Sequence, residues 1–107
     1  MKLCVSHKIK IGLHTYKVVF NPHLQADEEK AGSINYRTQI IELDPAFPQS
    51  QREVILWHEV IHGVSNNFRL AMSEECIDNL ATGVVQFLQD NFDIEFDFND
   101  IPVKDEK

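Results

Sequence analysis

The stretch REVILWHEVIHG, residues 52–63, marks the point at which the 107-residue chain changes from strand patterns to a helical pattern. Ser50 followed by Glu53 has the spacing of a capping box, which predicts that a helix begins at Gln51. We expect this helix to end at about residue 64 or 66. Apolar residues cover nearly its whole circumference, which predicts that the helix is buried. They are Val54, Ile55, Leu56, Trp57, Val60, Ile61 and Val64.

Two histidines on this helix have the spacing of a zinc site. His58 and His62 lie one turn apart on the same face, so their imidazoles can bind one zinc ion. Zinc with three protein ligands keeps a fourth position for water and lowers the pKa of that water to about 7. Glu59, beside the first histidine, would act as general base while the hydroxide attacks an amide carbonyl. The alternative is two buried histidines and a surface glutamate, but charged groups on an apolar helix need partners or a metal.

The third zinc ligand has to follow the two histidines. No histidine occurs after His62, and the longer pattern H-E-x-x-H-x-x-G-x-x-H is excluded because Asn66 and Arg69 stand where it requires Gly and His. The remaining candidates are Glu74 and Glu75, because the segment from residue 63 to residue 73 is long enough to reverse direction and return to the metal.

These two glutamates begin a second predicted helix, which we expect over residues 73–90 with Ser73 as its N-cap. Glu74 is favoured as the ligand because Asp78 lies one turn later on the same face. There its carboxylate would accept a hydrogen bond from the other ring nitrogen of a liganding histidine. Glu75 is expected to be a first-turn acid that the helix dipole stabilises. The apolar side of this helix is predicted to consist of Ile77, Leu80, Val84, Phe87 and Leu88.

Two strand patterns precede the zinc helix. Residues 7–20 alternate around Gly12 and predict one hairpin, and residues 31–45 predict a second hairpin that turns near Arg37 and Thr38. The order of a small antiparallel or mixed N-terminal sheet followed by two helices predicts an α+β fold. An extended peptide could pair with an edge strand of this sheet, formed by residues 33–37 or by residues 39–43.

The C-terminal residues are acidic and alternate in hydrophobicity. We expect a single domain over residues 1–91 and an acidic tail over residues 92–107, which is either a permanent strand or a segment that lies in the active-site cleft. If the tail occupies the cleft, its deletion should raise activity. The net charge of -7 argues against a nucleic-acid partner.

The composition predicts a cytoplasmic protein. The apolar runs are too short to span a bilayer, and the first residues contain no signal-peptide core. Cys4 and Cys76 are far apart in the sequence and are expected to be free thiols.

The candidate ligands also carry a family resemblance. HEVIH followed by Glu74 and Asp78 resembles the gluzincin metallopeptidases, whose third zinc ligand is a glutamate on a downstream helix. The segment EECIDNLA, residues 74–81, is similar to the E-x-x-A-N-x-F-A segment of the ImmA/IrrE-type metallo-endopeptidases, although Ile77 and Asp78 depart from that pattern. The short sheet before the zinc helix is similar to that family and to the single-domain minigluzincins. The resemblance implies a phage- or mobile-element-type protease that cuts a particular protein, such as a repressor.

The sequence therefore predicts a zinc-dependent endopeptidase that acts on a protein or peptide. One alternative is a non-catalytic zinc-containing module that binds a protein partner, and another is a metal-free interaction module in which the motif is a coincidence. Glu59 distinguishes the first two, because a structural zinc site has no use for a base. No residue is assigned to stabilise the oxyanion. Tyr36 and His14 are the candidates, although both also suit ordinary strand positions.

Overall fold

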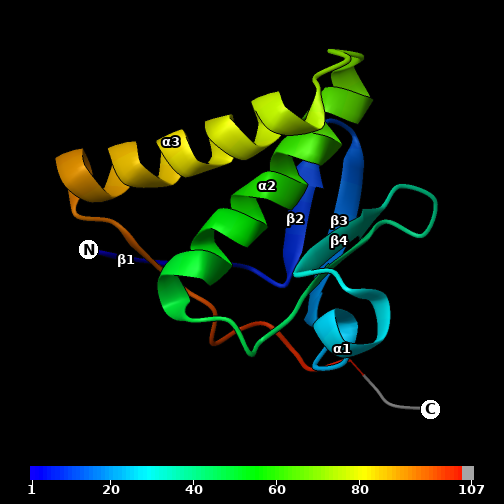
Figure 1. Ribbon diagram of the computed structural model, residues 1–107, viewed down its shortest axis with the longest axis horizontal. Coiled ribbons are helices and arrows are strands. Elements are labelled where there is room, and N and C mark those ends of the chain that lie inside the picture. The colour runs from blue at the N-terminus through cyan, green and yellow to red at the C-terminus, as the bar shows by residue number, and fades with distance from the viewer. Residues whose placement is uncertain (105–107) are drawn as a thin grey trace.

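The computed structural model describes residues 1–104 and confirms an α+β fold, in which a small mixed sheet is followed by two long helices (Figure 1). Residues 105–107, the end of the expected acidic tail, lie outside the described residues. None of the helices in the described range combines the length and the apolar content that crossing a membrane requires. The elements are β1 (Lys2–Cys4), β2 (Lys8–Ile11), β3 (His14–Phe20), α1 (Leu24–Glu28), β4 (Gly32–Asn35), β5 (Ile40–Leu43), α2 (Gln49–Phe68), α3 (Glu74–Phe92) and β6 (Glu95–Asp97).

The main sheet has four strands in the order β2-β3-β5-β4. Strands β2 and β3 form the first predicted hairpin, and Gly12 in its turn has a φ of 62°, a conformation that favours glycine. Strands β4 and β5 form the second predicted hairpin, with residues 36–39 between them. Because β3 and β5 pair in parallel, the two hairpins make one sheet. Of the two strands that we considered as a peptide-binding edge, β4 is at the edge and β5 is interior.

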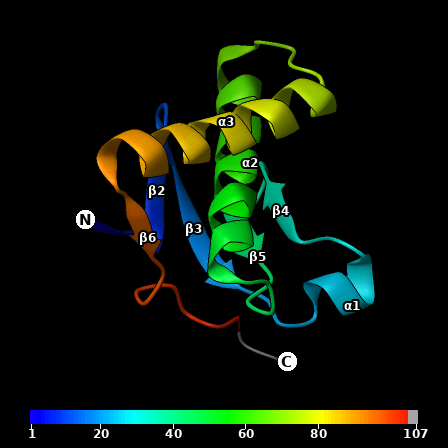
Figure 2. The ribbon, with the colours of Figure 1, turned by 60° about the vertical axis from the view of Figure 1, so that its left-hand side comes forward.

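Helix α2 lies between the sheet and α3, as Figure 2 shows. It begins two residues earlier than predicted, its N-cap is Pro48, and no side chain caps it, so the predicted capping box is wrong. The Glu53 carboxylate is only 1% exposed, and it accepts hydrogen bonds from two glutamine side chains and from the Phe96 amide. Glu53 therefore joins α2 to the end of α3 and to β6, and within its own helix it accepts only from the Gln49 side chain and caps no backbone amide.

Helix α3 begins as predicted, because the Ser73 hydroxyl accepts a hydrogen bond from the Cys76 amide at 3.1 Å. Its buried face differs from the prediction. Ile77, Ala81 and Val85 are buried, whereas 45% of Leu80 and 57% of Phe87 are exposed. The reason is that α3 packs mainly on α2 and leaves its opposite side uncovered (Figures 1 and 2).

Residues 92–104 belong to the folded unit, although we expected an acidic tail to follow a domain of residues 1–91. Strand β6 pairs with β1 in parallel, and Phe98 and Ile101 are buried in the main core. Phe96 and Phe98 thus pack in the core beside β3 and α2, whereas Phe92 is exposed, so the alternative in which this segment lies in the cleft is wrong. The alternative of a permanent strand holds for β6, whose partner is β1, and further along the chain Val103 forms an isolated parallel bridge with Phe20 of β3.

Candidate metal centre

The three predicted ligands converge at one point between α2 and α3. His58 and His62 face the same way from α2, and their Nε2 atoms are 3.1 Å apart. The Glu74 carboxylate enters from the first turn of α3, with one oxygen 2.7 Å from His58 Nε2 and the other 3.0 Å from His62 Nε2. The possible ligand atoms of these three side chains all lie within 4.8 Å of one another.

The donor atoms suit zinc. Two ligands of a tetrahedral zinc ion, each about 2.05 Å from the metal, are about 3.3 Å apart. The separation of 3.1 Å between the two imidazole nitrogens is close to that value, so a small adjustment would accommodate the ion. Two imidazoles and one carboxylate also leave a fourth position open, as catalytic zinc sites do.

Asp78 supports the first histidine in the way that the sequence predicts. Its carboxylate is 2.7 Å from His58 Nδ1, on the side of the ring that faces away from the ligand cluster. A hydrogen bond there fixes the tautomer, because the proton resides on Nδ1 and the lone pair of Nε2 is free for a metal. Glu75, which we expected to be an ordinary first-turn acid, is exposed and does not belong to the cluster.

Glu59 is buried beside the ligands, with 7% of its surface exposed. Burial raises the pKa of Glu59 to about 7; His58 opposes this rise, and the neighbouring Glu74 carboxylate adds to it. A pKa near neutrality is the value that suits a general base at physiological pH. The sequence identified Glu59, but it gave no sign of how strongly the site would desolvate it.

Two glycines allow the sheet to approach α2 closely. A Cβ atom at Gly32 of β4 would lie 2.6 Å from the Ile55 side chain and 3.1 Å from a Glu59 oxygen. A Cβ atom at Gly63, the residue after the second histidine, would lie 2.7 Å from Ile11 of β2. The sequence motif WHEVIHG therefore ends in a glycine because the helix touches the sheet there.

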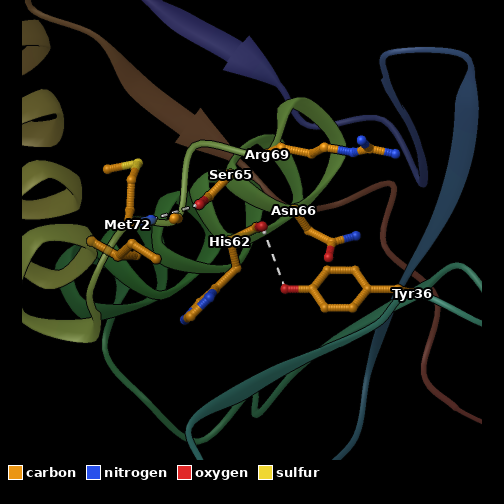
Figure 3. A pocket seen from close by; sticks show the side chains of 8 residues that line it. Tyr36, His62, Ser65, Asn66, Arg69 and Met72 are labelled. Atoms are coloured by element: carbon orange, nitrogen blue, oxygen red, sulfur yellow. Dashed lines mark hydrogen bonds between the residues drawn. The ribbon is translucent and has the colours of Figure 1, made fainter.

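Cavities open on both sides of the ligand cluster. One has a volume of about 320 Å³ and is lined by His58, Glu59, Gly32 and the exposed Lys30, among others. The other, shown in Figure 3, has a volume of about 390 Å³, and its lining residues include His62. The rest of its lining is Tyr36, Ser65, Asn66, Arg69, Ala71, Met72 and Ile77.

Edge strand β4 connects these two cavities, because Gly32 begins the strand and Tyr36 follows its last residue. A chain lying along β4 would thus pass the ligand cluster with a cavity on each side. Lys30, Gly32 and Arg69 were not singled out from the sequence, since only the fold brings these residues to the site. His14 is elsewhere, with its Nδ1 3.1 Å from the Gln39 side chain, and it lines neither cavity.

Comparisons with protein-family models, with curated proteins and with solved structures found no match to this chain. The chemistry of the centre therefore has to be inferred from its own residues. Those residues are two imidazoles and a carboxylate around one point, with a second, buried carboxylate beside them.

Proposed function

We propose that the chain is a zinc-dependent endopeptidase. The observation that supports this function best is the convergence of His58, His62 and Glu74 on one point beside the buried Glu59. A purely structural zinc site is normally closed by four protein ligands, whereas this centre offers three. It also keeps a buried carboxylate next to the open position, where a structural site would have no use for one.

The chain's own residues have distinct roles in this proposal. The two imidazoles and Glu74 hold the metal, and Asp78 orients His58 through its Nδ1 proton. When bound, zinc supplies Lewis acidity, which makes water acidic and polarises the peptide carbonyl. Glu59 takes the proton from the attacking water and delivers it to the nitrogen of the peptide bond that breaks.

The substrate in this proposal is an extended segment of a protein. The free edge of β4 offers backbone N–H and C=O groups, and a peptide that pairs with them passes the centre. The resemblance to ImmA/IrrE-type peptidases favours a specific protein target such as a repressor. The net charge of -7 disfavours nucleic acid, and the exposed, unbridged Cys4 and Cys76 favour a reducing compartment, which we take to be the cytoplasm.

The first experiment measures zinc content by mass spectrometry on protein purified without a metal-affinity tag. We expect about one zinc per chain in the wild type and much less in Glu74→Ala. Glu75→Ala is the matched control, because Glu75 is the exposed neighbour in the same helical turn and should leave the zinc content unchanged. Wild-type protein that binds no zinc after incubation with the metal would overturn the proposal.

A second experiment separates an enzyme from a non-catalytic zinc module. A library of internally quenched peptides is incubated with the zinc-loaded wild type and with Glu59→Gln. We expect cleavage by the wild type, a loss of at least about 100-fold in the variant, and equal zinc content in both. Zinc in both proteins without cleavage by either one would favour the non-catalytic module.

A further inference from the structure

The proposed active site contains a general base and three metal ligands. In the transition state the carbonyl oxygen of a substrate becomes negatively charged, and it then also needs a hydrogen-bond donor. Donors that are already positioned where this charge develops are a large source of rate enhancement. The useful donor has to lie beside the ligands, face the open side and have no essential structural bond.

Tyr36 meets the requirement of position. It is the first residue after edge strand β4, it lines the 390 Å³ cavity together with His62, and 40% of its surface is exposed. Figure 3 shows its hydroxyl pointing at the backbone of His62, one of the proposed ligands. A peptide that pairs with β4 would therefore pass this hydroxyl as it reaches the metal.

The hydroxyl is held only loosely where it is. It donates to the His62 carbonyl at 3.4 Å, which is long for a hydrogen bond between oxygens. That carbonyl lies inside α2, where the helix itself supplies an amide donor. Exchanging this contact for a bond to a substrate oxygen would thus cost little.

The backbone that carries Tyr36 is, by contrast, well fixed. The Asn35 side chain accepts hydrogen bonds from the Arg37 and Thr38 amides, both at 3.0 Å, and the Asn35 carbonyl accepts one from the Gln39 amide at 2.8 Å. The turn after β4 is therefore preorganised.

Two other polar groups near the ligand cluster, those of Ser65 and Lys30, are less suitable donors. The Ser65 hydroxyl is buried and accepts a hydrogen bond from the Met72 amide at 3.2 Å, so it serves the connection between α2 and α3. Lys30 lines the other cavity, on the side of Glu59. Among the described residues that line the His62 cavity, Tyr36 carries the hydroxyl whose hydrogen bond is not needed to hold a helix or a connection in place.

We propose that the Tyr36 hydroxyl is a catalytic hydrogen-bond donor to the carbonyl oxygen of the peptide bond that is cut. This inference rests on the proposed peptidase function. As the water oxygen bonds to the carbonyl carbon, the π electrons of the C=O bond move to its oxygen, and Tyr36 donates a hydrogen bond to that oxygen without transferring its proton. The C=O bond re-forms when the C–N bond breaks, and the leaving nitrogen receives the proton that Glu59 took from water.

The test compares the zinc-loaded wild type with Tyr36→Phe, which keeps the ring and removes only the hydroxyl. On the best peptide from the quenched library, we expect kcat to fall about 10- to 100-fold with KM changed less than about twofold. Thr38→Ala is the matched control, because it alters an exposed side chain in the same turn and should leave kcat unchanged. Zinc content should be equal in all three proteins.

A second measurement needs no turnover. A phosphinic peptide with the same sequence imitates the tetrahedral geometry, and calorimetry should show that it binds Tyr36→Phe about 10- to 100-fold more weakly than the wild type. A small hydroxamate that binds metal through its own oxygens should show no such difference.

Equal kcat and equal phosphinate affinity in wild type and Tyr36→Phe would overturn the role of Tyr36 while leaving the peptidase function intact. A loss of zinc in Tyr36→Phe would also overturn it, since the residue would then be structural. If the wild type binds zinc but cuts no peptide, the proposed function fails and the role of Tyr36 fails with it.

Discussion

Replacement of Glu59 by glutamine should change how the stability of the metal-free protein depends on pH. Burial raises the pKa of Glu59 in the folded protein to about 7, from 4.5 for an ordinary glutamate. The folded protein therefore holds this proton more tightly than the unfolded chain does. The stability that Glu59 contributes is fully present below pH 4.5 and is lost as the pH rises through 7, where the buried carboxylate becomes charged.

The size of the effect follows from the two pKa values. The difference between 4.5 and about 7 corresponds to about 3 kcal/mol of unfolding free energy, at about 1.4 kcal/mol for each pKa unit. Glutamine has nearly the same shape and no charge to desolvate, so Glu59→Gln should avoid this loss. In a domain of this size, 3 kcal/mol changes the melting temperature by on the order of 10 °C.

The assay is urea and thermal unfolding of both proteins between about pH 5 and pH 8, in excess chelator. The quantity of interest is the difference between variant and wild type at each pH, which cancels the titration of groups that do not interact with Glu59. We expect this difference to change by about 2–3 kcal/mol in favour of the variant between the acidic and the alkaline end of the range.

Glu75→Gln is the control for this assay, because it makes the same substitution at an exposed position outside the ligand cluster. A difference for Glu59→Gln that stays constant within about 0.5 kcal/mol over the whole range would refute the reasoning, because it would mean that the site does not desolvate the carboxylate.

Two further predictions concern the packing that holds the site. Gly63→Val should lower the free energy of unfolding by about 1–3 kcal/mol, because a Cβ at this position would lie 2.7 Å from the Ile11 side chain. Gly83→Ala is the control, because a Cβ there would have no neighbour within 4 Å, and it should raise the free energy of unfolding in urea by up to about 1 kcal/mol. A Gly63→Val variant as stable as the wild type would contradict the close contact with Ile11. Truncation after residue 91 should cost more than about 4 kcal/mol, because the buried Phe98 and Ile101 are lost, and a cooperative transition at the wild-type midpoint would contradict this.

The sequence predicted the local elements well because each has a local cause. The alternation around Gly12 and the second hairpin are encoded within a few residues, and the Ser73 cap requires only its own helix. The predicted capping box was wrong because α2 begins before Ser50 and because two of the three partners of Glu53, Gln89 and Phe96, are over 30 residues away in the sequence. A local pattern cannot indicate which of two competing partners a carboxylate will have.

In the candidate metal centre, too, local spacing could be predicted from the sequence, whereas contacts between distant segments could not. The i, i+4 spacing fixes the two histidines on one face, and the spacing of Glu74 and Asp78 fixes two carboxylates on another, so both pairs could be predicted from helix geometry. The structure places the Glu74 carboxylate near His58 Nε2 and the Asp78 carboxylate near His58 Nδ1. The cavities could not be predicted in this way, because Lys30 and Arg69 reach the site only through the packing of α2 against β4 and α3.

A metal bound at the candidate centre would also help to hold α3 against α2. The contact between α2 and α3 is centred on a small cluster of Ile61, Ile77 and Ala81, and the opposite face of α3 is exposed. Ligands from both helices meet beside this cluster, so a bound ion would also link α3 to α2. Chelation would then weaken the fold and stop the chemistry together, and loss of activity after chelation would not identify a catalytic metal. Glu59→Gln keeps every proposed ligand and removes only the proposed base, so it is the change that would separate catalysis from folding.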